Sequence, residues 1–252
     1  MSPADLALAR LLTRRDWSPR AALPLLATVA ILAAIASDAT LPVVGARDPI
    51  DAAPVGSIIR GVMLPWVGDH LGAATSVLAI LLSARRVAGL TDPWLAPFAA
   101  GGASRVTIAA ATLANATALA LVALLVATLA WSTGAREPAT ALLQRLASLT
   151  GPAALVTACA AYGAAAAIVA RRRGRALLVA VAGFAVPTAI LLTAQRASAR
   201  PVPRPAARIV TAHLPLTTQR GDPVTVTRQL AYTIVVTTLL LHAAPGRVAR
   251  ER

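Results

Sequence analysis

Mostly apolar intervals separate the charged positions of this sequence, and six of them come close to or exceed the length of a membrane span. Five of the six carry no charge, and the second contains Asp69. A helix needs about 20 apolar residues to cross the hydrocarbon core, and an ionised side chain at mid-bilayer costs about 2.5–3.5 kcal/mol. Each interval therefore predicts one membrane-spanning helix. The predicted spans are residues 21–37, 61–83, 106–132, 149–170, 176–195 and 229–245.

The composition agrees with a helical membrane protein. Hydrophobic residues make up 57% of the 252 residues, and charged residues only 13%, whereas soluble domains carry about 25% charged residues. A membrane β-barrel would instead show segments of about 10 residues that alternate between apolar and polar positions. We therefore expect an all-α integral membrane protein, a bundle of six transmembrane helices that forms a single domain over residues 1–252.

The first interval has a second interpretation. Ala34-Ile35-Ala36 resembles the small-x-small cleavage site of a signal peptide. We expect the segment to be retained as a span.

The basic residues predict the orientation of the bundle. The net charge is +14, and every basic residue is Arg. On a soluble chain such a charge would suggest nucleic acid, but on a membrane chain arginines beside the spans mark the cytoplasmic side. The tight RRRGR turn at 171–175 is unfavourable to translocate, which predicts that both termini lie in the cytoplasm. We expect a multi-pass protein of the bacterial cytoplasmic (inner) membrane that contacts membrane lipids and no nucleic acid.

Common catalytic motifs are missing from the sequence. A Walker A loop needs a Lys, and the chain has none. No HExxH motif occurs, and the single Cys159 excludes CxxC metal sites. We therefore expect no enzyme activity, no metal and no cofactor in this chain.

The segment between the second and third predicted spans carries a recognisable order of residues. Residues 84–111 read ARRVAGLTDPWLAPFAAGGASRVTIAAA. They resemble the region before span three in permease subunits of type-2 ATP-binding-cassette (ABC) exporters, which have six spans and both ends inside. The matching residues are Arg85 or Arg86, Gly89, Leu90, Leu95, Pro97, Ser104 and Arg105. The family usually has an acidic residue before the glycine, where this chain has two arginines.

The resemblance implies a permease subunit that pairs with a second permease subunit, as a homo- or heterodimer, and binds a separate cytoplasmic ATPase subunit. The implied ATPase-coupling residues are Arg85, Arg86, Gly89, Leu90, Asp92, Trp94, Leu95, Pro97, Phe98 and Arg105. The alternative is a non-transporting structural or assembly subunit of a larger membrane complex. In that case the segment is an ordinary basic cytoplasmic loop.

Asp69, His70 and Asn115 are the candidate polar site residues inside the predicted spans. Asp69 and His70 either face a cavity in the membrane or lie at the external interface beside Trp66, and we favour the interface. Asn115 is expected to hydrogen-bond across helices.

The external loop at 196–224 is rich in Pro and Arg. Its alternating prolines predict an extended chain. Its arginines either contact lipid phosphates or an anionic partner, or are simply solvated. They are Arg196, Arg200, Arg204 and Arg208.

Overall fold

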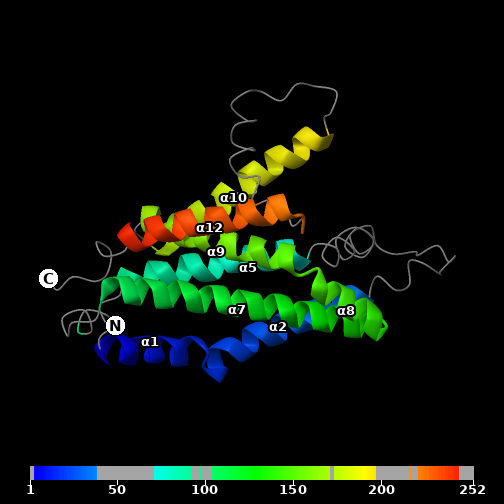
Figure 1. Cartoon of the computed structure of the whole chain (residues 1–252), viewed down its shortest axis with the longest axis horizontal. Helices are drawn as coiled ribbons and strands as arrows, with labels where there is room; N and C mark the ends of the chain where they lie inside the picture. Colours follow the sequence, from blue (N-terminus) through cyan, green and yellow to red (C-terminus); the bar gives the residue numbers. More distant parts are fainter. Residues whose placement is uncertain are drawn as a thin grey trace.

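The computed structural model describes residues 3–38, 71–91, 97, 104–170, 173–196, 216 and 221–243. Every regular element in these residues is a helix (Figure 1). The α-helices are α1 (Pro3–Asp16), α2 (Pro19–Asp38), α5 (Leu71–Ala88), α7 (Arg105–Gly134), α8 (Ala139–Ala147), α9 (Thr150–Ala170), α10 (Arg173–Arg196) and α12 (Pro223–Ala243), and a 3-10 helix, η3, covers Gly89–Thr91. The all-α prediction is confirmed for the described part of the chain.

Among the described residues, four helices are long and apolar enough to cross a membrane: α5, α9, α12 and the Val106–Gly134 part of α7. Helices α1 and α2 qualify together as one span that is bent by 46° at its break. Helix α10 contributes a shorter apolar stretch at Gly174–Ile190. These lengths support a multi-pass membrane protein with four or five candidate spans, and the six-span count stays a prediction.

Helices α5, α7 and α9 pack against one another in the middle of the bundle (Figure 1). Helix α1 lies along the first half of α7 and α2 along the second half, while α12 packs on α9, and α10 on α9 and α5. Helix α7 begins at the end of the bundle where α1 lies, and α5, α9 and α12 finish there. We call this the α1 end, and the opposite one the α8 end.

Small side chains bring α5 and α9 close together. Gly163 of α9 faces Ile80 and Ser83 of α5 so closely that an added Cβ would collide with the Ile80 carbonyl oxygen. Such close backbone approach is how membrane helices gain packing energy, because lipid offers no hydrophobic driving force for their association. The buried residues of α5 are Gly72, Thr75, Ser76, Ala79, Ile80, Ser83, Ala84, Val87 and Ala88.

The helix boundaries depart from the predicted spans in two places. Helix α5 ends at Ala88 rather than 83, so the two arginines lie within its last turn. Helix α12 begins at Pro223 rather than 229, and it includes the last two residues of the predicted external loop at 196–224. The early start of α12 has a local cause: Asp222 Oδ2 accepts a hydrogen bond from the Thr225 N–H at 2.9 Å, and proline fits the first helical position.

Two helices were not predicted at all. Helix α1 contains three arginines and two aspartates, and α8 contains Arg145, so neither lies in a charge-free interval. A search for uninterrupted apolar stretches cannot detect such amphipathic helices.

Candidate functional site

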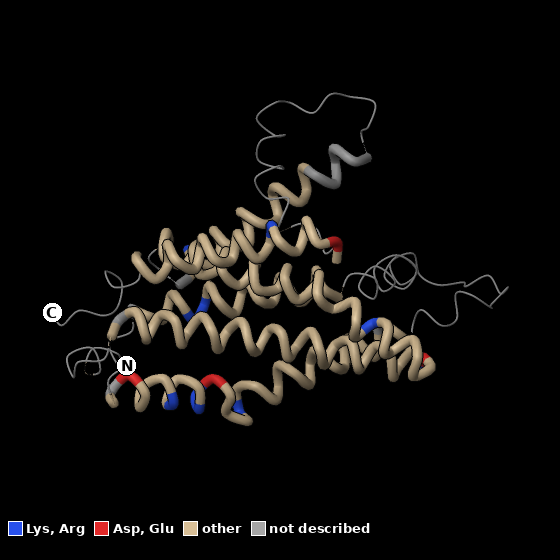
Figure 2. The backbone as a smooth tube through the Cα atoms, viewed as in Figure 1, with Lys and Arg blue, Asp and Glu red and all other residues tan. Residues whose placement is uncertain are grey.

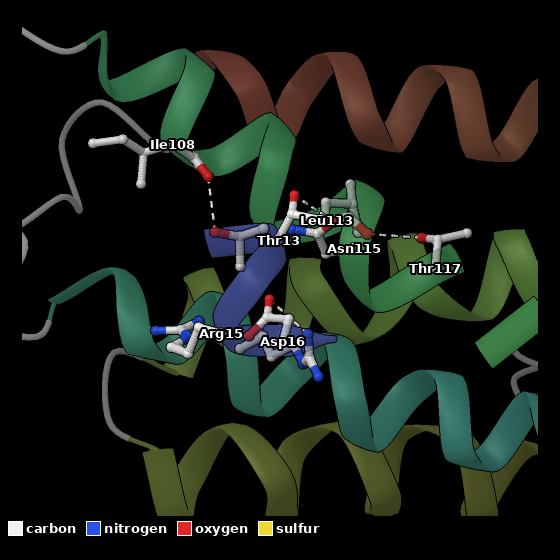
Figure 3. Close-up of polar contacts among 9 residues, drawn as sticks. Thr13, Arg15, Asp16, Ile108, Leu113, Asn115 and Thr117 are labelled. Atoms are coloured by element: carbon white, nitrogen blue, oxygen red, sulfur yellow. Dashed lines mark hydrogen bonds and ion pairs between the residues drawn. The ribbon is translucent and has the colours of Figure 1, made fainter. Parts of the chain in front are cut away.

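Polar residues gather at the α1 end, where α1 crosses the last turn of α5 and the first turns of α7 (Figure 3). We call this group the polar cluster. It comprises Asp5, Thr13 and Asp16 of α1, Arg86 of α5, and Ser104 and Asn115 at the start and in the first half of α7.

An ion pair joins α1 to α5. Arg86 Nη1 lies 2.6 Å from Asp16 Oδ2, and the exposed fractions of the two side chains are 13% and 6%. Arg15 Nε lies 3.0 Å from Asp16 Oδ1, but its side chain is 44% exposed. Asp16 therefore sits between two guanidinium groups, one buried and one at the surface. Removing one partner of a buried pair is costly, because the other charge is left uncompensated.

A second carboxylate of α1 caps α7. The Ser104 backbone N–H donates to Asp5 Oδ1 at 2.6 Å, and Asp5 is only 5% exposed. Ser104 is the N-cap of α7, and its own hydroxyl oxygen accepts from the Thr107 N–H at 3.5 Å. A negative charge at this position satisfies an otherwise unpaired backbone donor and opposes the positive end of the helix dipole.

An uncharged hydrogen bond also joins α1 to α7, at a position of α1 between Asp5 and Asp16. The Thr13 hydroxyl donates to Asn115 Oδ1 at 3.3 Å, as Figure 3 shows. Asn115 is 9% exposed, and no described residue accepts a hydrogen bond from its Nδ2 group. The predicted role of Asn115 as an interhelical hydrogen-bonding residue is consistent with this geometry.

The two aspartates hold both ends of one segment. Arg86 lies just before residues 89–104 and Ser104 closes them, while Asp16 and Asp5 lie about three helical turns apart on α1. Leu8 and Leu12, each 1% exposed, occupy the same face of α1 and pack into the bundle. Helix α1 therefore contacts both the end of α5 and the start of α7, the two helices that residues 89–104 connect.

The predicted coupling residues differ in how exposed their side chains are. Arg85 is exposed in the last turn of α5, whereas Arg86 points into the polar cluster. Gly89 and Leu90 form η3, and Leu90, 2% exposed, belongs to the hydrophobic core rather than to a free surface. Pro97 is exposed, and Arg105 is the first residue of α7.

Several predicted site residues lie outside the described residues. These are Asp69, His70, Asp92, Trp94, Leu95, Phe98, Arg200, Arg204 and Arg208; Arg196 ends α10, but its side chain is likewise outside the description.

Sequence reasoning found Arg86 and Asn115 but missed Asp5, Thr13 and Asp16. The signal was present, because Asp5, Leu8, Leu12 and Asp16 recur at helical spacing and share one face. Aspartates on the apolar face of an amphipathic helix indicate buried partners for their charge.

The α8 end carries an ion pair of its own. Arg145 of α8 binds Glu137 through Nε–H and Nη2–H, with distances to Glu137 Oε1 of 3.0 and 2.6 Å. The Ser132 hydroxyl donates to Glu137 Oε2 at 2.8 Å, and these hydrogen bonds, chiefly the one from Arg145, lower the pKa of Glu137. Arg136, in the left-handed region at φ 52°, turns the chain so that Glu137 can reach both donors.

Hollows on the surface of the bundle are lined by described residues. One of about 510 Å³ at the α8 end is lined in part by Arg145, Ser148 and Thr150. A groove of about 370 Å³ between α7 and α12 and another of about 340 Å³ between α5 and α10 are lined almost entirely by apolar and threonine side chains. In the described residues, no three His, Cys, Asp or Glu side chains come together as a metal site.

Comparison with known protein families, with curated proteins and with solved structures finds no match.

Proposed function

We propose that the chain is the membrane-spanning permease subunit of an ABC-type exporter of the bacterial inner membrane. In this proposal it carries no catalytic site. ATP hydrolysis takes place on a separate cytoplasmic ATPase, which binds residues 89–104.

The observation that carries the proposal is the attachment of both ends of that segment to α1. Asp16 holds the α5 side through Arg86, and Asp5 holds the α7 side through the Ser104 N–H. A force on the segment would therefore reach α5, α7 and α1 together, and α2 through the 46° bend after α1. Transmission of movement from an ATPase to several spans needs such a firmly held element.

The arrangement of charges supports the same orientation. Arginines of α1, the last turn of α5 and the start of α10 all lie at the α1 end, which supports a cytoplasmic location for that end by the positive-inside rule. The segment assigned to the ATPase would then face the cytoplasm, where ATP is available.

A second candidate function is favoured by the outer surface of α12. This helix is mostly exposed, and its large apolar side chains could pack against another subunit instead of lipid. The exposed ones are Val224, Leu230, Ile234, Val235 and Leu239. Such a surface suits a structural or assembly subunit of a larger membrane complex, and it also suits a permease dimer.

Extraction of the full chain in a mild detergent, followed by identification of the bound chains, tests the proposal. An ATPase should co-purify with the parent protein. Leu95→Glu should release it, since an apolar anchor commonly contributes about 2 kcal/mol or more to an interface. Leu143→Glu makes the same change at an exposed position of α8, at the opposite end of the bundle, and should leave the ATPase bound.

Two results would contradict the proposal. One is a parent protein that carries no ATPase under conditions that preserve other membrane complexes. The other is an ATPase that stays bound to Leu95→Glu. Co-purification with non-ATPase membrane subunits alone would instead favour the structural role.

A further inference from the structure

Helix α1 separates its charges onto two faces. Its aspartates lie on the side toward α7 and α5, and both are 5% exposed. Arg10 and Arg14 lie on the opposite side and are exposed. Figure 2 shows this division, with the red positions of α1 toward α7 and the blue ones away from it.

The outer face is both basic and apolar. Arg10 and Arg14 are one helical turn apart, and Leu6 and Leu11, 46% and 42% exposed, lie on either side of them. Among the described residues, no carboxylate lies within ion-pair distance of Arg10 or Arg14. Within the described part of the chain, the face therefore offers two guanidinium groups without a counter-charge, flanked by aliphatic side chains.

The position of α1 along the bundle matches the lipid headgroups. Helix α2 has 20 residues and is about 30 Å long, which is the thickness of the hydrocarbon core. Helix α1 precedes it across a bend at Trp17–Pro19, so α1 lies beyond the core when α2 fills it. Trp17 is half-buried at this junction, where aromatic side chains commonly mark the membrane interface.

We infer that the outer face of α1, defined by Leu6, Arg10, Leu11 and Arg14, binds the phosphate groups of anionic phospholipids. The guanidinium groups supply paired N–H donors that match phosphate oxygens, and the leucines contact the upper part of the acyl chains. Neither arginine belongs to the segment assigned to the ATPase, so the lipid contact is independent of the transporter role.

A fluorescent label on α1 can report the lipids beside it. Ala7 is exposed on the same face, and the native Cys159 is 0% exposed. Ala7→Cys therefore introduces the accessible thiol needed for selective labelling of the full chain. The labelled protein is placed in phosphatidylcholine nanodiscs that contain a fixed small fraction of either brominated phosphatidylglycerol or brominated phosphatidylcholine, and bromine quenching is measured.

Brominated phosphatidylglycerol should quench the label more strongly than brominated phosphatidylcholine at the same fraction. Arg10→Gln/Arg14→Gln should bring the two toward equality, with about a five-fold loss of preference for each arginine removed. Arg136→Gln/Arg228→Gln removes the same charge from exposed positions outside α1 and should leave the preference intact. Unchanged elution in size-exclusion chromatography confirms that the variants fold.

Equal quenching by the two lipids in the parent protein would overturn the inference, and so would a preference that survives in Arg10→Gln/Arg14→Gln. Loss of the preference in millimolar inorganic phosphate, at an ionic strength matched with chloride, would assign the site to free phosphate instead. A label shielded from both lipids by a co-purified protein would assign the face to a protein partner.

Discussion

Single residues decide how α1 is attached to the bundle. Its two carboxylates are buried, and charges of this kind are tolerated in an apolar environment only when they are paired. Asp16 has the Arg86 and Arg15 guanidinium groups, and Asp5 has the N-terminus of α7. The leucines between them add apolar contact area but cannot by themselves fix the register of α1 against α7.

Asp16→Asn should destabilise the protein by about 3–5 kcal/mol, because Arg86 is then buried without a counter-charge. Arg86→Gln should cost less, since Arg15 still neutralises Asp16. The Asp16→Asn/Arg86→Gln double variant should be more stable than Asp16→Asn alone, because it leaves no uncompensated buried charge. The free energy of unfolding in a denaturing detergent titration measures all three.

The control for this cycle is Arg14→Gln, at an exposed position of the same helix. It should change stability by no more than about 0.5 kcal/mol. Additive costs for Asp16→Asn and Arg86→Gln would show that the two side chains do not interact.

The sequence alone could identify some of these residues but not their partners. Arg86 was chosen through the resemblance of residues 84–111 to the exporter segment, and Asn115 because a polar group is unusual inside an apolar span. The pairing of Arg86 with Asp16 was not predictable, since it depends on how helices distant in the sequence pack. The predicted coupling role of Leu90 ignored the same packing, which buries its side chain in the core.

At the scale of elements, the contact between α5 and α9 depends on residues that have a small side chain or none. Gly163 lets the two backbones approach, and Ser83 bonds its hydroxyl to the Ala79 carbonyl at 2.7 Å instead of to another helix. The interface is therefore held mainly by close packing, which is sensitive to one added methyl group.

Gly163→Ala should destabilise the bundle by about 1–3 kcal/mol, because the new methyl group meets the Ile80 backbone, which cannot rotate away. Gly174→Ala is the matched control on α10, where nothing lies within 4 Å of the added group. It should be neutral, or stabilising by up to about 1 kcal/mol through helix propensity. Equal thermal stabilities for the two variants would contradict close packing at Gly163.

Apolar length predicted the elements that are uniform in sequence, such as α7 and α9, to within a few residues. It failed where the helix is amphipathic, as in α1, or where a cap sets the boundary, as Asp222 does for α12. Charge-free intervals indicate membrane spans because charged side chains are unfavourable in lipid. They contain no information about helices that lie beside the membrane or about local capping.

At the scale of the whole molecule, sidedness follows from which end collects the arginines. The described helices alternate in direction, so α5, α9 and α12 all finish at the α1 end. If this end is cytoplasmic, the Glu137–Arg145 pair and α8 lie outside the cell, and the connection between α5 and α7 lies inside.

Cysteine labelling in intact cells tests the orientation. Gly174→Cys at the start of α10 should be labelled only by membrane-permeant reagents, whereas Thr140→Cys on α8 should react with impermeant ones. Both positions are exposed, and the native Cys159 is buried, so background labelling is low. Equal access of impermeant reagent to both positions would contradict the predicted six-span topology.

The hydrogen bond from Ser104 to Asp5 spans 99 positions of the chain, and this separation has a consequence for biosynthesis. A ribosome adds about 5–20 residues per second, so roughly 5–20 s pass between the synthesis of Asp5 and that of its partner. During this time the Asp5 carboxylate lacks its partner on α7, whereas Asp16 already has the adjacent Arg15. Helix α1 therefore cannot make its contacts with α5 and α7 until both of those helices have been synthesised.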